Sequence, residues 1–95
     1  MFFVIHATDK QNALEWRAKH YREHRIHLDQ SDTHGVSVLM AGPLVADDGE
    51  TPVGSLFVIE AKNRAAVDSF TRSDPYSIHG IWDRIEIHYF NKKRG

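Results

Sequence analysis

An imidazole and a carboxylate, far apart in the chain, can together form an acid–base pair. His24 lies in a helix-forming run without glycine or proline, and Asp74 lies directly before Pro75, which must end the preceding helix. A carboxylate beside an imidazole fixes its tautomer and raises its pKa, so that the ring can exchange protons near neutral pH. The same spacing also fits a structural histidine and a helix-ending aspartate, and both interpretations stay open.

Three histidines in the same run offer a different chemistry. His20, His24 and His27 could share a zinc ion, because histidines four residues apart lie on one side of a helix. The run lacks the flanking glutamate of the familiar zinc helix, so a solvated histidine face is the favoured interpretation and no metal is expected. The chain also has no cysteine, glycine-rich phosphate loop or serine elbow, which argues against thiol, P-loop and serine-nucleophile chemistry.

Composition narrows the class of protein. The 95 residues carry a net charge of −1 and the only basic run, 92–94, lies at the very end, so no nucleic-acid partner is expected. One domain over residues 1–95 is predicted, without an apolar run long enough to cross a membrane. The opening MFFVIHATDK lacks the basic region of a signal peptide, so a cytoplasmic location is expected.

The elements that must position the acid–base pair follow from periodicity and capping. Thr8 or Asp9 is expected to cap the first helix and Asn63 the second, which Pro75 ends. The predicted order is a strand at 2–7, a helix at 12–28, a strand at 35–42, a turn-rich connection at 43–54, a strand at 55–61, a helix at 64–74, a loop or short turn at 76–83 and a strand at 84–90.

This order predicts an α+β, ferredoxin-like βαββαβ fold, with a four-stranded antiparallel sheet and two helices on one face. The other face is then open. The first strand nevertheless places Phe2 and Val4 on one face and Phe3 and Ile5 on the other, so both faces are apolar. The simplest cover for the open face is a second copy of the chain, and we expect a homodimer with a barrel-like core between the two sheets.

The first helix has an apolar stripe and a polar edge. With about 100° between successive residues, the stripe faces the sheet, and Arg17 and His24 lie at its edge. His20 and His27 lie further round, towards solvent. Arg25 falls near the middle of the stripe, so either the helix is irregular there or Arg25 reaches past the core to a polar cleft. The members of the stripe are Leu14, Ala18, Tyr21 and Leu28.

Several short pieces, taken in order, resemble the YciI-like (YCII) family of small proteins over nearly the whole chain. These pieces are MFFVIHATDK at 1–10, Arg17 and His24, AGPL at 41–44, PVGSLFVIEA at 52–61 and SDPYSIHGIWDRIEI at 73–87. The resemblance implies a ferredoxin-like fold of the dimeric α/β-barrel class. It also implies that His24 and Asp74 are the catalytic pair, and that Ser55 and the Gly42–Pro43 turn line the pocket.

Two positions beside the expected site depart from the family pattern. Tyr21 stands where members often have a second arginine, and Arg25 stands where a leucine tends to follow the histidine. The substrate can therefore differ from that of other members. Most members have no assigned reaction, but one branch of similar size is a dehydrochlorinase that acts on chlorinated hydroxyhydroquinone.

The resulting hypothesis is an enzyme that transfers a proton on a phenolic or quinone-like ring, followed by elimination of chloride or by isomerisation. His24, oriented by Asp74, would accept the proton. Arg17 or Arg25 would attract a phenolate, and Ser55 would donate a hydrogen bond to a ring oxygen. This chemistry requires no metal and no organic cofactor.

Two aromatic residues complete the hypothesis. Tyr76 and Trp82 would wall the ring by stacking, although ordinary core packing accounts for both residues equally well. The alternative to an enzyme is a non-catalytic protein that binds a small ligand or accompanies another enzyme. It would have the same pocket without turnover.

Overall fold

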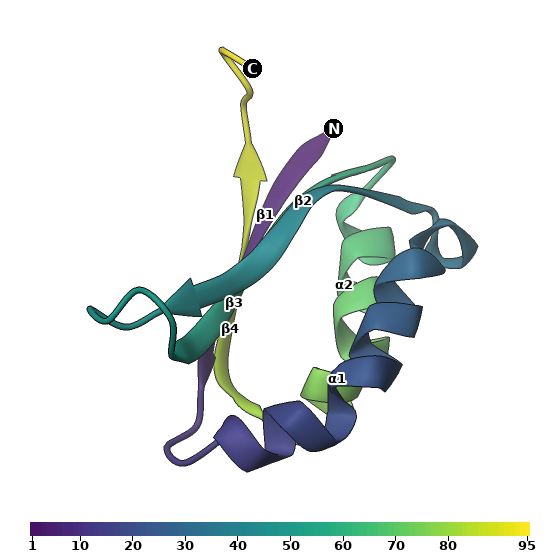
Figure 1. The fold of residues 1–95 in the computed structure, drawn as a ribbon. Coiled ribbons are helices and arrows are strands. Elements are labelled where there is room, and N and C mark those ends of the chain that lie inside the picture. The colour runs from purple at the N-terminus through teal and green to yellow at the C-terminus, as the bar shows by residue number, and fades with distance from the viewer.

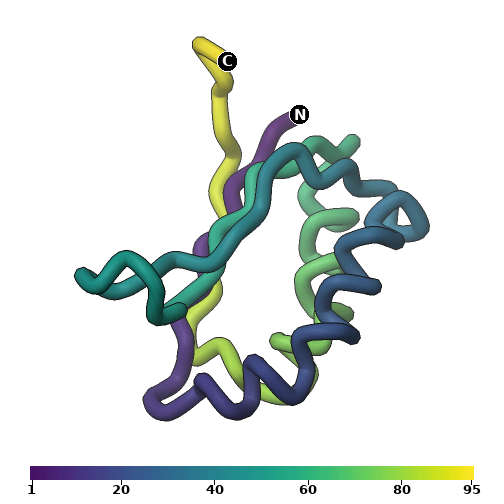
Figure 2. Tube along the Cα trace, viewed as in Figure 1, coloured from purple at the N-terminus to yellow at the C-terminus, as the bar shows by residue number.

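The computed structural model describes residues 1–95, and both chain ends lie beyond the same end of the sheet (Figure 1, Figure 2). Its elements are β1 Phe2–Asp9, α1 Leu14–Asp29, the 3-10 turn η1 Ser31–His34, β2 Val36–Val45, β3 Pro52–Ala61, α2 Arg64–Ser73, α3 Pro75–Ile78 and β4 Trp82–Phe90. None of the helices has both the length and the apolar character that crossing a membrane requires.

The sheet contains four antiparallel strands in the order β2–β3–β1–β4. Ile5 in the central strand β1 lies opposite Phe57 of β3 on one side and Ile87 of β4 on the other. α1 and α2 lie side by side over one face, and no helix covers the other (Figure 1). The predicted α+β class, with a four-stranded antiparallel sheet and helices on one face, is confirmed.

The apolar core lies between the sheet and α2. Phe3 and Ile5 of β1 and Ile59 of β3 are at most 1% exposed, and Phe70 of α2 packs with them. α2 begins where predicted, because the side chain of Asn63 accepts a hydrogen bond from the backbone N–H of the third helical residue. This half of the helical layer is therefore an ordinary amphipathic helix on a sheet.

α1 packs differently, because its buried residues are polar: Arg17, His20 and His24. Leu14 and Tyr21 belong to the stripe that was predicted to face the sheet, yet they are 51% and 52% exposed. The stripe does turn towards the sheet, but α1 stands off from the strands and the stripe lines a cavity instead of a core. The predicted helix cap is wrong as well, since α1 follows Ala13 without a side-chain cap.

The prediction that His20 and His27 point towards solvent is wrong. His20 is only 7% exposed, because the segment that follows α3 covers it and the ring of His79 stacks on its ring with 3.7 Å between centroids. His27 is half-buried, and its Nε2 donates a hydrogen bond of 2.8 Å to the carbonyl oxygen of Phe70 in α2. Both rings therefore join α1 to its neighbours instead of forming a solvated face.

Half of the connection predicted at 43–54 is strand. β2 continues to Val45 and β3 begins at Pro52, which leaves a short hairpin loop. Asp48 holds this loop by accepting hydrogen bonds from the Thr51 side chain and from two backbone N–H groups, and these bonds lower the pKa of Asp48 to about 2. Proline is tolerated here because β2 is an edge strand and because Pro52 opens β3.

The segment predicted as a loop or short turn at 76–83 contains one turn of helix and the start of a strand. Asp74 caps α3 by accepting a hydrogen bond of 2.9 Å from the backbone N–H of Tyr76, and Pro75 occupies the first helical position, which favours proline. β4 then begins at Trp82, two residues earlier than expected. The cap and the proline therefore fix the conformation of Asp74.

Gly54 fits a position in β3 where a side chain has no room. A Cβ atom built on it would lie 2.3 Å from the backbone oxygen of Ala7 in β1. We expect Gly54→Ala to lower the free energy of unfolding by about 1–3 kcal/mol, because the β1–β3 pairing must shift. Urea denaturation measures this change. The control is Gly42→Ala in β2, where an added Cβ has no atom within 4 Å; an equal loss in both variants would contradict the steric explanation.

Candidate functional site

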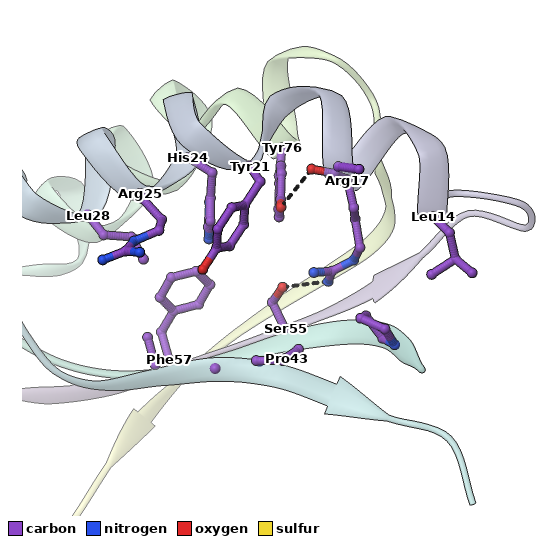
Figure 3. A pocket seen from close by; sticks show the side chains of 14 residues that line it. Leu14, Arg17, Tyr21, His24, Arg25, Leu28, Pro43, Ser55, Phe57 and Tyr76 are labelled. Atoms are coloured by element: carbon purple, nitrogen blue, oxygen red, sulfur yellow. Dashed lines mark hydrogen bonds between the residues drawn. The ribbon is translucent and has the colours of Figure 1, made fainter. Parts of the chain in front are cut away.

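A cavity of about 590 Å³ lies between α1 and the strands β2 and β3 (Figure 3). This volume is in the range of sites for small molecules. Half of its 14 lining residues are hydrophobic. Every residue predicted to bind substrate lines it, namely Arg17, Arg25, Gly42, Pro43, Ser55 and Tyr76.

His24 and Asp74 are in direct contact at the wall of this cavity. Nδ1 of His24 lies 2.8 and 2.9 Å from the two carboxylate oxygens of Asp74, which is 1% exposed. Because a carboxylate accepts, Nδ1 carries the proton and Nε2 of the neutral ring keeps its lone pair. Nε2 has no hydrogen-bond partner within the chain and stays accessible. The ring extends from α1 towards the strands in Figure 3.

Tyr76 fixes the plane of the imidazole. Its ring is stacked on that of His24, with 4.0 Å between centroids and 1° between planes. The hydroxyl of Tyr76 donates to the backbone oxygen of Arg17 over 3.2 Å, so the phenol is held at both ends. Burial raises the pKa of Tyr76, which keeps this donor protonated at neutral pH. The wall behind the histidine is therefore rigid.

Arg17 crosses the end of the cavity and is held there through its Nε and Nη2 atoms. Its Nε and Nη2 donate to the carboxylate of Asp9 over 2.5 and 3.1 Å. Nη2 also donates to the Gly54 carbonyl oxygen over 2.6 Å and to Ser55 Oγ over 2.8 Å (Figure 3). Asp9 neutralises the guanidinium. Because Ser55 Oγ accepts from Arg17, its own proton is free to be donated to a bound molecule.

Arg25 is the cavity's other arginine and has no acidic partner. Its guanidinium carbon lies 5.8 Å from the centre of the Tyr21 ring, and no carboxylate lies within ion-pair distance. α1 is a regular helix through this position. An irregular helix is therefore not the reason for its place in the apolar stripe. Arg25 lines the cavity, which is more apolar than the polar cleft that was expected, and brings an uncompensated positive charge to it.

Several residues have a different place or role from the one that the sequence predicted. Trp82 was expected to wall the ring, but it is 5% exposed, does not line the cavity and packs edge-on against Tyr76 and His24. Asp9, expected as a helix cap, instead holds Arg17. Phe57, which the sequence did not single out, is a core residue of β3 that also forms part of the cavity floor. The nitrogen of His24 contacts Asp74 and that of His27 contacts the Phe70 carbonyl oxygen. The nitrogens of His20, His24 and His27 therefore do not converge on one point where they could share a metal ion.

A model of the YCII-related domain family matches residues 1–91 of the chain. The chain belongs to this family. YCII relatives include Protein YciI of Escherichia coli O6:H1, which is 30% identical over 97% of this chain and 98% of that protein. An uncharacterized protein of Haemophilus influenzae is 31% identical with the same coverage. The expected family is thus confirmed.

Solved structures give the same fold. The 5-chloro-2-hydroxyhydroquinone dehydrochlorinase TftG from Burkholderia phenoliruptrix AC1100, in complex with 2,5-dihydroxybenzoquinone, superimposes with a TM-score of 0.81. It is 24% identical, over 96% of this YCII chain and 94% of that one. An antibiotic biosynthesis monooxygenase superimposes with a TM-score of 0.57 at 18% identity, over 99% of this chain and all of the other. At these identities the likeness establishes the ferredoxin-like architecture.

The buried phenol of Tyr76 makes stability depend on pH in alkaline solution. Above pH 10 an unfolded tyrosine loses its proton while the folded one, with its raised pKa, keeps it. The folded state then binds more protons, so stability falls as the pH rises. We expect the free energy of unfolding of the wild type to fall more steeply with pH than that of Tyr76→Phe. The difference between the two slopes should be at most about 1.4 kcal/mol per pH unit. Urea denaturation between pH 9 and about 11 measures it, and parallel curves would contradict the assignment.

Proposed function

We propose that the chain is a small-molecule enzyme in which His24 acts as the acid–base group and Asp74 orients it. One observation carries the proposal: Asp74 holds Nδ1, while Nε2 is left free at the cavity. A general base needs a positioned lone pair, and Nε2 of the imidazole supplies one. The reaction class is proton transfer on a phenolic or quinone-like ring, in a cofactor-independent lyase or isomerase.

The cavity's polar groups favour an apolar ring with an acidic hydroxyl group. Phe57 and Pro43 form an apolar surface at the floor of the cavity, and the Ser55 hydroxyl can donate a hydrogen bond to a ring oxygen. Asp9 already neutralises Arg17, so we assign attraction of the phenolate to Arg25 and positioning of Ser55 to Arg17. Arg25 has no carboxylate partner, so its uncompensated positive charge favours an anion in the cavity.

Dehydrochlorination of a chlorinated hydroxyhydroquinone is the specific reaction we propose. Nε2 of His24 accepts a proton from a ring hydroxyl and returns it to the adjacent ring carbon that bears chlorine, so that the ring becomes a ketone. Chloride then leaves with its bonding pair while the hydroxyl para to that ketone loses its proton. The products are a hydroxyquinone, chloride and a proton, with no external oxidant. The fold of TftG, named as a dehydrochlorinase, supports this choice.

A non-catalytic small-ligand-binding or accessory protein is the second candidate. Asp74 has a structural role that requires no turnover, because it caps α3 through the backbone N–H of Tyr76. The stacked Tyr76 ring and the bond from Asp74 would then simply hold a buried histidine in place. A binder would keep the cavity and its ligand preference, and loss of His24 would change affinity without changing any rate.

Chloride release under anaerobic conditions tests the catalytic proposal. With chlorinated hydroxyhydroquinone as substrate, His24→Ala should lower kcat by about 10²- to 10⁴-fold. Asp74→Asn keeps a good helix cap but no longer fixes the tautomer, and should lower kcat by up to about 10⁴-fold. His34→Ala is the matched control, since His34 lies in η1 and does not line the cavity.

Each outcome of this assay separates the candidates. Loss of turnover in both site variants, with normal rates in the control, would support the dyad. Turnover that survives His24→Ala would overturn it. If the folded wild type releases no chloride, this substrate is wrong. A screen of ring compounds then distinguishes another proton-transfer reaction from simple binding, according to whether any compound is converted.

We also propose that the chain works as a homodimer through the open face of the sheet. Phe2, Val4, Leu56 and Val58 are only half-buried there and no helix covers them. Val4 and Val58 are paired at the centre of this face. Burial of such a face against a second copy would remove apolar area that this small chain cannot cover by itself.

Light scattering after size exclusion tests the dimer. We expect about twice the 10.9 kDa of one chain for the wild type. Val58→Glu should shift the mass to that of a monomer, because a carboxylate would be buried without a partner. The control is Val53→Glu, in the same strand but already 42% exposed. A monomeric wild type, or a Val58→Glu variant that stays dimeric, would contradict this interface.

A further inference from the structure

A second cluster of reactive side chains lies beside the cavity, and none of its three residues lines it. His20 and Glu23 come from α1, and His79 directly follows α3. One ligand atom from each of these three residues lies within 4.8 Å of the others. We call this the His20–Glu23–His79 cluster. It is separate from the proposed dyad, and its two histidines have no role in the proposed reaction.

His20 is the unusual member of the cluster. Its side chain is more than nine-tenths buried, and its Nδ1 is buried without any hydrogen-bond partner. Buried polar atoms nearly always have a partner, so this nitrogen needs an explanation. The ring is held in place by two others, since Trp16 stacks at 6.3 Å and His79 at 3.7 Å between centroids. Its nitrogen therefore stays directed at the cluster.

The separations within the cluster are those of metal ligands more than of hydrogen bonds. Glu23 Oε2 lies 3.7 Å from His20 Nδ1 and 3.6 Å from His79 Nε2, beyond ordinary hydrogen-bond length. Two ligand atoms that each lie about 2.0–2.1 Å from one tetrahedral ion are roughly 3.4 Å apart. An ion between these atoms would supply the partner that Nδ1 of His20 lacks.

We propose that His20, Glu23 and His79 bind a borderline divalent transition-metal ion such as Zn²⁺. Two imidazoles and one carboxylate form a donor set that suits Zn²⁺, whereas Mg²⁺ and Ca²⁺ prefer oxygen ligands alone. A water molecule would complete a tetrahedral site. Because the lone pairs of stacked rings lie in nearly parallel planes, the His79 ring must turn out of the stack to share the ion with His20, and its side chain is 39% exposed.

Bound metal would connect α1 to the end of α3. His20 lies one helical turn before His24 in α1, and His79 follows the one-turn helix that Asp74 caps. The ion would therefore bridge the same two elements that the His24–Asp74 contact joins, one helical turn earlier along α1. It would stabilise the arrangement without entering the cavity.

Calorimetric titration of metal-free protein, purified without an affinity tag, tests the proposal with Zn²⁺ as the probe. We expect one Zn²⁺ per chain in the wild type. His79→Ala should weaken the affinity at least tenfold, and Glu23→Gln should weaken it too, while His34→Ala should leave it unchanged. His79 and Glu23 are exposed, so these variants are expected to fold, unlike a change at buried His20. Affinity should also fall as the pH is lowered, because protons compete for imidazole.

A second readout identifies the ligands directly. Ring-nitrogen resonances of His20 and His79 should shift on addition of Zn²⁺, and those of His34 should not. Absence of saturable binding at submillimolar Zn²⁺ would overturn the proposal. So would wild-type affinity in His79→Ala, or an equal loss in His34→Ala, which would mean scattered binding to the chain's surface histidines.

Discussion

The site depends on one buried carboxylate. Asp74 is almost fully removed from solvent, so its charge must be satisfied by donors within the chain. The imidazole of His24 and the backbone N–H of Tyr76 supply them, and these contacts join α1 to the junction of α2 and α3. Because the two helical segments meet at this charge, the position of the histidine follows from electrostatics more than from shape.

α1 is anchored by polar contacts, and this explains why a cavity exists beneath it. Its buried side consists of Arg17, His20 and His24, each held by a specific partner or a stacked ring. The apolar side is left free to face the strands across open space. A helix held by apolar packing would close onto the sheet. Here the polar anchors keep it apart, while α2 provides the core.

The sequence predicted the elements better than the spaces between them. A continuous apolar run was sufficient for β1, alternation for most of β4, and the Asn63 cap with Pro75 for α2. The apolar stripe of α1 was misinterpreted, because periodicity shows which side of a helix turns inward but not whether that side meets a core or a cavity. Pro43 suggested a loop, because the place of its strand at the sheet edge is a tertiary property. Helix order and the Asp-Pro pair left the pairing of His24 with Asp74 as one of two open interpretations, and the resemblance to the YCII family favoured it. The roles of Asp9 and His20 depended on partners far along the chain.

The irregular edge strand β2 has a consequence for behaviour at high concentration. It carries a proline at position 43, and its pairing with β3 shifts register between Val38 and Met40. An edge strand can pair with a strand of another molecule through its free backbone groups. In β2 the proline lacks an N–H and the register shift interrupts the regular spacing of these groups, so such pairing is disfavoured. The chain can therefore expose Met40 and other apolar side chains along β2 with little risk of growing into fibrils from this side.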